Sequence, residues 1–308
     1  MKLVRDLEQL PNELRGGAIS IGNFDGVHRG HAQLVTRLLA QARSLGGPAI
    51  ALSFDPHPAQ LLRPDQAPPA LTTTDQKALL LAEAGVDAVV AYPTTRQMLE
   101  LTADEFFNRI VREQLGARGM VEGSNFCFGR NRTGTIDVLR QLTRSAGIEL
   151  DVVEPVVFEG SPVSSSRIRK LLAEGQVDVA ARLLGRAYQV QGQVVRGAAR
   201  GARLGFPTAN LAEVQTVLPA MGVYAGAANV AGQTWPAAIH LGPNATFGED
   251  PVKLEIHLIG YQGDLYGQSL AVDFHRRLRE TRKFDGMDAL QQQLVADIAA
   301  ASVLVPPT

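Results

Sequence analysis

The sequence AISIGNFDGVHRGH, residues 18–31, combines a short apolar run, a glycine-rich turn and two histidines. Residues 18–21 have the apolar, β-branched composition of a buried strand. The first two glycines permit a tight turn with close approach of the backbone. We expect a helix to begin near Gly30 or His31, with its free N–H groups directed toward any anion bound in the turn. The stretch therefore predicts a strand, a phosphate-binding turn and a helix.

The remainder of the first half continues to alternate strand and helix patterns. Thr102 and Glu105 match a capping box, which predicts a helix through Leu115. Another helix is expected to begin near Thr74 or Asp75. Further strands are expected at residues 49–54, 87–91, 120–121 and 148–153. Strands that alternate with helices predict a parallel α/β sheet with helices on both faces.

The second half has a different pattern. Glycine becomes frequent, and short alternating segments such as residues 189–195 and 254–259 follow one another between Gly-rich turns. This pattern is typical of a small antiparallel β-barrel. A final helix is expected from about Met287 to Ala301. We expect the domain boundary near Gly185, with domains 1–185 and 186–308.

Composition limits the classes of protein that this chain can represent. Its 308 residues, 45% hydrophobic and 20% charged, are enough for two cores. A net charge of -1 provides no global basic field for nucleic acid. The single cysteine, Cys127, excludes an intrachain disulfide and fits a reducing compartment. The sequence shows neither a signal peptide nor a run of roughly 18 apolar residues. We therefore expect a cytoplasmic protein with no nucleic-acid or membrane partner.

His28 and His31 lie three residues apart at the expected helix start. Both imidazoles could donate hydrogen bonds to nucleotide phosphate oxygens. Alternatively, they are surface or capping histidines, which is the ordinary interpretation of an isolated H-x-x-H. A zinc site is disfavoured because no further Cys or His lies nearby at ligand spacing.

The complete string G-x-F-D-G-V-H-x-G-H resembles the nucleotidyltransferase half of the prokaryotic bifunctional riboflavin kinase/FAD synthetase family. The resemblance extends over nearly the whole chain. Three more segments resemble family motifs in the family order: SFDPHP at 53–58, GSNFCFG at 123–129 and VSSSRIR at 163–169. Asn125 stands where many relatives carry Asp, and Ser166 stands where Thr is usual, so both positions keep a polar side chain.

This resemblance implies a Rossmann-like domain in which the FMN phosphate attacks the α-phosphorus of ATP and pyrophosphate leaves. The protein then acts by positioning the reactants and balancing charge. His28 and His31 are the catalytic residues that the resemblance implies, and Asp25 orients the loop or meets the magnesium–nucleotide complex. The residues that it implies for nucleotide or phosphate binding are Gly22, Phe24, Asp25, Asn125, Ser164, Ser165 and Arg169.

A second motif occupies residues 192–210, G-x-V-x-x-G-x-x-x-G-x-x-L-G-F-P-T-A-N. By itself it predicts a Gly-rich hairpin followed by a Pro-initiated turn. It also resembles the flavokinase signature, as do GVYA at 222–225, LEIH at 254–257 and GDLYG at 263–267. The resemblance implies a riboflavin kinase barrel in which Thr208 and Asn210 supply oxygen atoms to Mg²⁺. The other residues that it implies for ATP binding are Gly197, Gly201, Gly205 and Phe206.

Glu255 alternates with Leu254, Ile256 and Leu258, so it faces away from that apolar set. Ordinarily a strand glutamate in such a position is solvated. The resemblance implies instead that Glu255 accepts the proton from the riboflavin 5′-hydroxyl.

Asp264, Arg279 and Phe284 are the flavin contacts that the resemblance implies. The basic run that contains Arg279 is also typical of a solvated sheet edge. The chain departs from the family pattern at three positions, with His240 for Asn, Ala245 for Pro and Thr281 for a frequent Glu.

Two phosphate-handling motifs of different construction predict a bifunctional enzyme. The resemblance implies that it makes FMN and then FAD from riboflavin and ATP, with Mg²⁺ as cofactor. Its partners would be these small molecules, with apo-flavoproteins as recipients of the product. An adenylyltransferase for phosphopantetheine or nicotinamide mononucleotide would share the first motif but lack the barrel. A flavin storage or sensor protein would need neither the two histidines nor Thr208 and Asn210.

Overall fold

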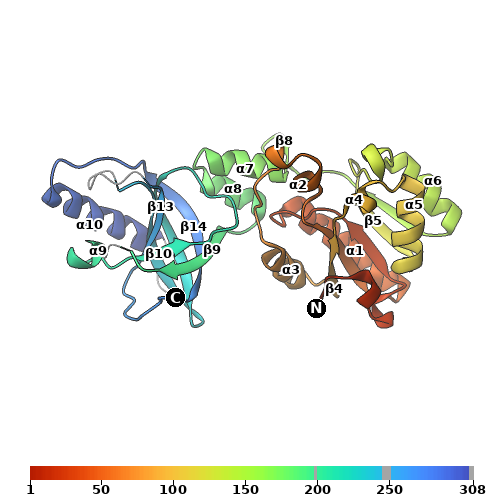
Figure 1. Cartoon of the computed structure of the whole chain (residues 1–308), viewed down its shortest axis with the longest axis horizontal. Coiled ribbons are helices and arrows are strands. Elements are labelled where there is room, and N and C mark those ends of the chain that lie inside the picture. The colour runs from red at the N-terminus through yellow and green to blue at the C-terminus, as the bar shows by residue number, and fades with distance from the viewer. Residues whose placement is uncertain (198–199, 245–250, 305–308) are drawn as a thin grey trace. The chain divides into compact units, whose positions relative to one another are not determined.

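The computed structural model describes residues 1–197, 200–244 and 251–304 (Figure 1). The chain divides into two compact units, Met1–Ser164 (unit 1) and Ser165–Thr308 (unit 2). This division falls before the two helices that precede Gly185. The sequence pattern changes only after those helices.

Unit 1 contains a six-stranded sheet in the order β1-β4-β3-β2-β5-β6, with every neighbouring pair parallel. The strands are β1 (Lys2–Val4), β2 (Ala18–Ile21), β3 (Ala49–Asp55), β4 (Ala88–Pro93), β5 (Gly119–Gly123) and β6 (Glu149–Val153). The predicted parallel α/β sheet is thus confirmed. β1 was not predicted, because three residues are too few to show a period; it pairs with β4 at the edge of the sheet.

Helices cover both faces of this sheet, as predicted. α1 (Arg29–Leu45) and α3 (Thr74–Glu83) pack on the face that carries Ala18, and α5 (Ala103–Phe106) and α6 (Ile136–Ala146) pack on the face that carries Ile19. The helix that Thr102 caps was expected to continue as a regular helix through Leu115. Its capping box is present, but the segment Phe107–Gln114 is π-helical. The wider turn keeps Phe107, Ile110 and Val111 buried together.

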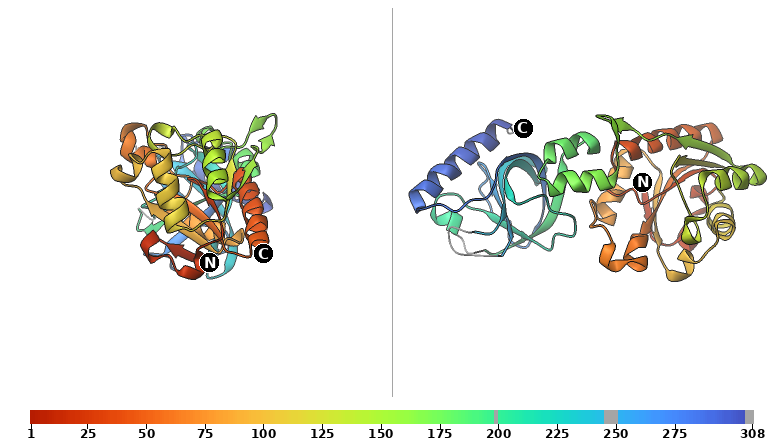
Figure 2. Two further views of the ribbon diagram at one scale, coloured as in Figure 1. Left: turned by 90° about the vertical axis from the view of Figure 1, so that its right-hand side faces the viewer. Right: turned by 90° about the horizontal axis from the view of Figure 1, so that it is seen from above.

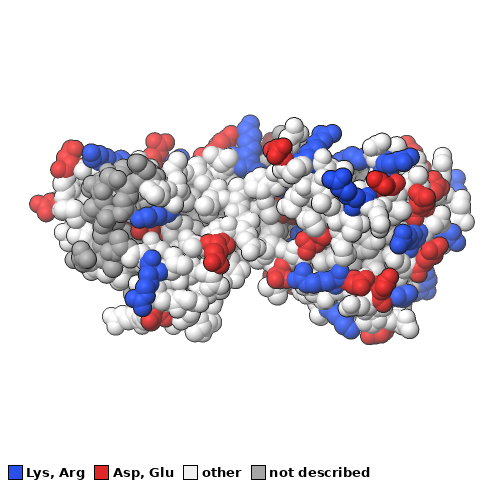
Figure 3. Space-filling view, in the orientation of Figure 1, with Lys and Arg blue, Asp and Glu red and all other residues white. Residues whose placement is uncertain are grey.

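The smaller elements of unit 1 connect these layers. They are α2 (Pro58–Leu62), α4 (Arg96–Leu99) and a hairpin of β7 (Val157–Phe158) and β8 (Ser161–Pro162), with short 3-10 turns at Leu7–Gln9, Asn12–Leu14, Pro64–Gln66 and Arg130–Arg132. Basic and acidic side chains are interspersed over the face of unit 1 shown in Figure 3.

The strands of unit 2 form the predicted antiparallel barrel, closed in the order β10-β13-β12-β11-β14-β9. Their bounds are β9 (Tyr188–Val195), β10 (Ala209–Ala212), β11 (Gly222–Val230), β12 (Gln233–Gly242), β13 (Lys253–Leu258) and β14 (Ser269–Arg279). Leu254, Ile256 and Leu258 are buried, whereas Glu255 between them is only partly so, which confirms the predicted alternation. Tyr224 and Phe274 fill the interior with an edge-to-face contact at 5.2 Å.

Four helices accompany the strands in the described part of unit 2: α7 (Ser165–Ala173), α8 (Val177–Leu184), α9 (Arg200–Arg203) and α10 (Met287–Leu304). α8 packs on β14 and α10 packs on β11 and β12, on different sides of the barrel (Figure 2). The Leu172 carbonyl accepts a hydrogen bond of 2.8 Å from the Ala220 amide. No helix within the described ranges has the length and hydropathy that a membrane span requires.

Candidate functional sites

The first candidate site lies at the carboxyl ends of β2 and β5. The chain leaves β2 through α1 to reach β3 on one side, whereas β5 pairs with β2 on the other side. Open α/β sheets bind their ligands at such a switch in strand order. The Gly22–His31 loop follows β2, and the exposed Asn125 follows β5. The fold thus brings two sequence-predicted segments to the same edge of the sheet.

The loop after β2 has an unusual backbone that side-chain hydrogen bonds hold in place. Phe24, Gly26 and Val27 have φ values of 47°, 80° and 39°. The Asp25 carboxylate accepts hydrogen bonds from the amides of Leu71 and Thr72 at 3.0 to 3.1 Å. These contacts fit the loop-orienting role that the sequence analysis gave Asp25.

His28 is the N-cap of α1. Its Nδ1 accepts the His31 amide at 3.4 Å, and the two imidazoles stack with their centroids 3.7 Å apart. A Cβ at Gly30 would lie 3.1 Å from His28 Cε1, so glycine makes room for the ring. The capping interpretation of His28 is therefore correct, and it is compatible with a second role for the ring.

His31 is half-buried, whereas His28 is 6% exposed, but the Nδ1 atom of His31 is itself buried. Burial, followed by the positive charges available at His28 and Lys77, lowers the pKa of His31 well below its usual value. Its Nδ1 is buried without a hydrogen-bond partner in the portion of the chain that the structure describes. The ring is therefore neutral at neutral pH and still has one N–H to donate.

Sequence reasoning missed Lys77, which lies beneath the same loop. Lys77 is 8% exposed, and its Nζ donates to Ser53 Oγ at 2.8 Å. Ser53 Oγ in turn donates to the Asn23 carbonyl at 3.1 Å, which links α3 and β3 to the loop. Burial lowers the pKa of Lys77, and it outweighs the negative charges of Asp25 and Asp55, which raise that pKa. The sequence did contain a signal for the burial of Lys77, because Lys77 lies four residues before the apolar Leu81 and thus on the same helix face.

The remaining phosphate-binding residues predicted for this site follow the β7–β8 hairpin, the last element of unit 1. Ser164 is the last residue of unit 1, and Ser165 and Arg169 belong to α7 of unit 2. Their role as phosphate ligands stays a prediction.

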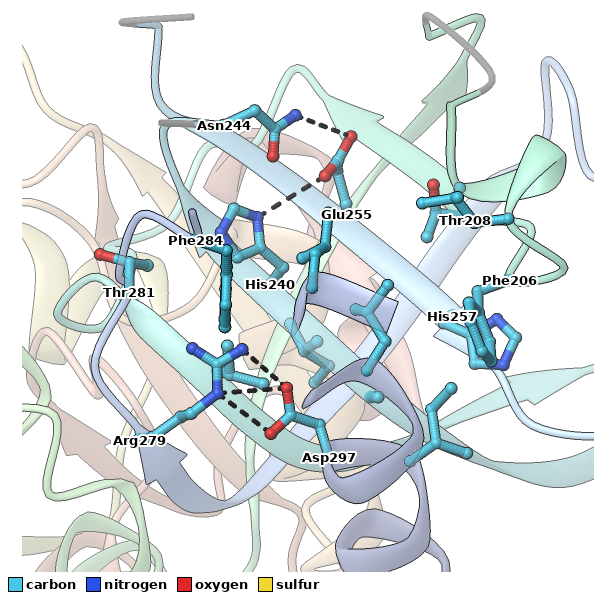
Figure 4. A pocket seen from close by; sticks show the side chains of 18 of the residues that line it. Phe206, Thr208, His240, Asn244, Glu255, His257, Arg279, Thr281, Phe284 and Asp297 are labelled. Atoms are coloured by element: carbon cyan, nitrogen blue, oxygen red, sulfur yellow. Dashed lines mark hydrogen bonds and ion pairs between the residues drawn. The ribbon is translucent and has the colours of Figure 1, made fainter. Parts of the chain in front are cut away.

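The second candidate site is a pocket of about 150 Å³ in unit 2 (Figure 4). It joins one wall of the barrel to α10, which contributes Leu290, Leu294 and Ile298. The sequence-predicted residues that line it are Gly201, Phe206, Thr208, Asn210, Glu255, Arg279 and Phe284. Gly197 and Gly205 are not among the lining residues, and Asp264 is exposed in a turn, where it accepts the Tyr266 amide at 2.9 Å.

Thr208 and Asn210 both line this pocket. Asn210 in β10 is the register partner of Glu255 in β13. A Cβ at Gly197 would lie 2.4 Å from Asn210 Nδ2, so only glycine permits this approach. Hydroxyl and amide oxygens are ligands that Mg²⁺ accepts, with water and substrate phosphates completing its coordination. The described residues contain no cluster of three or more His, Cys, Asp or Glu that could hold a metal by itself.

Glu255 has two polar neighbours in the pocket. His240 Nδ1 lies 3.6 Å from Oε2, and Asn244 Nδ2 donates to Oε1 at 3.4 Å. Burial raises the pKa of the Glu255 carboxyl, but hydrogen bonds and charge from His240, then Asn244 and Lys253, outweigh burial and lower it overall. Glu255 is therefore ionised at neutral pH and able to accept a proton.

Arg279 makes a buried ion pair that the sequence did not indicate. Its guanidinium donates twice to Asp297 of α10, Nη2 to Oδ2 at 2.7 Å and Nε to Oδ1 at 3.0 Å. Phe284 lies 5.6 Å from the same guanidinium. The basic residue expected to contact flavin or phosphate thus fastens α10 to the barrel.

The three residues that depart from the family pattern lie in different surroundings. His240 contacts Glu255, Thr281 lines the pocket, and Ala245 lies outside the described residues.

Comparisons with known proteins cover both halves of the chain. A family model described as FAD synthetase matches residues 10–167, and one described as riboflavin kinase matches residues 184–305. A Pseudomonas fluorescens bifunctional riboflavin kinase/FMN adenylyltransferase is 38% identical over 100% of this chain and 99% of its own length. Proteins of the same description from Escherichia coli K12 and Haemophilus influenzae are 34% and 31% identical, with at least 96% of each chain covered.

A solved structure shows the same fold. It is described as a macrolide-efflux protein from Streptococcus pneumoniae, is 29% identical, and covers 97% of both chains with a TM-score of 0.86. The likeness extends over the parallel sheet and the barrel.

Proposed function

The chain belongs to the family of bifunctional riboflavin kinases/FMN adenylyltransferases, and we propose that its two activities reside at the two sites described above. It is an enzyme that phosphorylates riboflavin to FMN with ATP and adenylylates FMN to FAD with ATP. The geometry supports the kinase step in the barrel pocket and the adenylyl transfer at the edge of the parallel sheet.

In the barrel, Glu255 accepts the proton of the riboflavin 5′-hydroxyl while that oxygen attacks the γ-phosphorus of ATP and ADP leaves. The Glu255 carboxylate carries this proposal because it is ionised, partly buried and adjacent in register to Asn210. Thr208 and Asn210 would hold Mg²⁺, which neutralises charge on the phosphates. The apolar side chains of α10 and Phe284 suit the flavin ring.

At the edge of the parallel sheet, the FMN phosphate attacks the α-phosphorus of ATP and pyrophosphate leaves. This nucleophile is already an anion, so no protein base is needed. His28 and His31 donate hydrogen bonds to the phosphate oxygens on which negative charge develops. The free amides at the start of α1 add to that stabilisation. A neutral His31 imidazole carries one N–H that can donate to a phosphate oxygen.

One assay tests both assignments of activity. Purified protein is given riboflavin, ATP and Mg²⁺, and the flavins are separated by chromatography at successive times. FMN should appear first and FAD should follow. Riboflavin that is unchanged by ATP would favour a flavin-binding protein, and accumulation of FMN alone would place the defect at the first site.

We also propose residues 1–185 and 186–308 as the two catalytic domains. The riboflavin kinase model supports this choice because it begins at residue 184, although the FAD synthetase model ends at residue 167 and α7 and α8 belong by compactness to unit 2. Fragments 165–308 and 186–308 distinguish the alternatives. Kinase activity in both would support the boundary near Gly185. Activity in the longer fragment alone would make α7 and α8 part of the kinase.

We propose cytoplasmic residence, because both reactions consume ATP and the sole cysteine, Cys127, has no disulfide. Apo-flavoproteins are the proposed recipients of the FAD product.

A further inference from the structure

We propose that His240 is a positioning residue for the kinase step, which lies against Oε2 of Glu255 and fixes the direction in which the carboxylate meets the substrate hydroxyl. This inference rests on the proposed role of Glu255 as the base.

The strand register places the two side chains together. His240 in β12 and Glu255 in β13 are direct partners in the antiparallel ladder, so their side chains point to the same face of the barrel. Figure 4 shows both projecting into the pocket, with His240 Nδ1 3.6 Å from Glu255 Oε2. Because the backbone ladder sets this distance, the contact does not depend on a flexible loop.

The contacts around the carboxylate are asymmetric. Oε2 faces His240 across the ladder, and Oε1 accepts from Asn244, which follows the end of β12. A strand and the segment that leaves it therefore hold the two oxygens separately. The side chains of His240 and Glu255 are 27% and 20% exposed, so water competes weakly for the carboxylate. Glutamate has three rotatable side-chain bonds, and these neighbours restrict them.

The other charged groups of the pocket do not replace His240. Arg279 is already bound to Asp297, and His257 Nδ1 lies 2.8 Å from the Pro207 carbonyl. The resemblance places Asn at position 240 in many relatives, and an Asn amide, like the His240 ring nitrogen 3.6 Å from Oε2, can direct an N–H toward the carboxylate. We therefore expect the hydrogen-bond donor to matter more than the ring.

The test is a double-mutant cycle on the full chain, with initial FMN formation measured against riboflavin concentration. His240→Phe keeps a ring of similar size and removes the donor. It should lower kcat by about 10²-fold, the loss expected from a small misplacement of a reacting group, with KM little changed. His240→Asn should recover most of kcat. In a Glu255→Gln background, His240→Phe should have less than about a twofold further effect, since its action passes through Glu255.

His275→Phe is the matched control, because His275 lies on β14 outside the lining of the pocket. Fluorescence of Trp235 on β12 during urea unfolding reports whether the barrel of each variant is folded, and His240→Ala replaces His240→Phe in the cycle if the latter melts early. An unchanged rate for Glu255→Gln would overturn the proposed base itself. A large effect of Glu255→Gln beside a full rate for His240→Phe would overturn only the inference, as would an equal loss from His240→Phe in both backgrounds.

Discussion

The two sites hold their polar groups in different ways. At the edge of the parallel sheet, Asp25 binds backbone amides and His28 caps a helix, so the loop is fixed mainly through the main chain. In the barrel pocket, Glu255 and Arg279 each meet side chains from other elements. The difference follows the chemistry. A reaction between two phosphates needs donors at fixed places, whereas an alcohol nucleophile also needs a base.

The comparison is tested most strongly by Glu255→Gln. The substitution keeps the shape of the side chain and removes its basicity, so riboflavin phosphorylation should fall by about 10²- to 10⁴-fold. Binding of riboflavin and ATP should change little, because the loss concerns the transition state. Riboflavin phosphorylation and the formation of FAD from supplied FMN are measured on one protein preparation. The rate of FAD formation should be unaffected. A kinase rate equal to that of the parent would mean that Glu255 is a solvated strand residue.

The histidines of the first site test the other half of the comparison. His31→Ala or His28→Ala should lower FAD formation by about 10²- to 10³-fold, the usual effect of losing one such donor. FMN formation in the same protein should survive. For His28, Asn is the matched variant because it can still cap α1. Equal loss of both activities would show that the pair supports the fold, and full FAD formation in His28→Asn would leave His28 only its capping role.

Asp297 tests whether side-chain pairing also stabilises the barrel. Asp297→Ala leaves the guanidinium of Arg279 without its buried partner, and the free energy of unfolding should fall by about 3 kcal/mol. Urea unfolding followed by fluorescence measures this change, because Trp235 of β12 is the only tryptophan in the chain. The double variant Arg279→Met/Asp297→Leu should recover stability. If the double variant is as unstable as the single one, packing of α10 rather than the charge pair is responsible.

The smallest expected effect concerns Glu122 of β5, which is 1% exposed and accepts the Ile21 amide at 2.7 Å. Burial raises the pKa of Glu122 well above its usual value, although the hydrogen bond from the Ile21 amide acts to lower it. A raised folded-state pKa stabilises the fold fully below the unfolded pKa, and the contribution is lost as pH rises through the folded pKa. Glu122→Gln should therefore raise the Tm of unit 1 at alkaline pH by about 2–4 °C, or about 1 kcal/mol. Parallel Tm profiles of parent and variant from pH 5 to 9 would contradict this.

The pattern of apolar and polar residues along the sequence predicted those features of the structure that depend on residues close together in the chain. Ala18–Ile21 is a strand as expected, and the alternation around Glu255 was correct because a strand has a period of two. The contact of His240 with Glu255 depends on the pairing of β12 with β13, which the sequence does not state. The Arg279–Asp297 pair and the burial of Lys77 depend on how helices dock. The family resemblance located the glycine loops but could not show which charges pair inside this chain.

The cap of α1 also selects the tautomer of His28. A neutral imidazole carries its hydrogen on one nitrogen only, and Nδ1 must be the unprotonated one in order to accept the His31 amide. The hydrogen is therefore assigned to Nε2. Folding of the helix start thus decides which atom of His28 donates, and protonation of Nδ1 would break the cap. In this loop the backbone determines the chemical form of a side chain as well as its place.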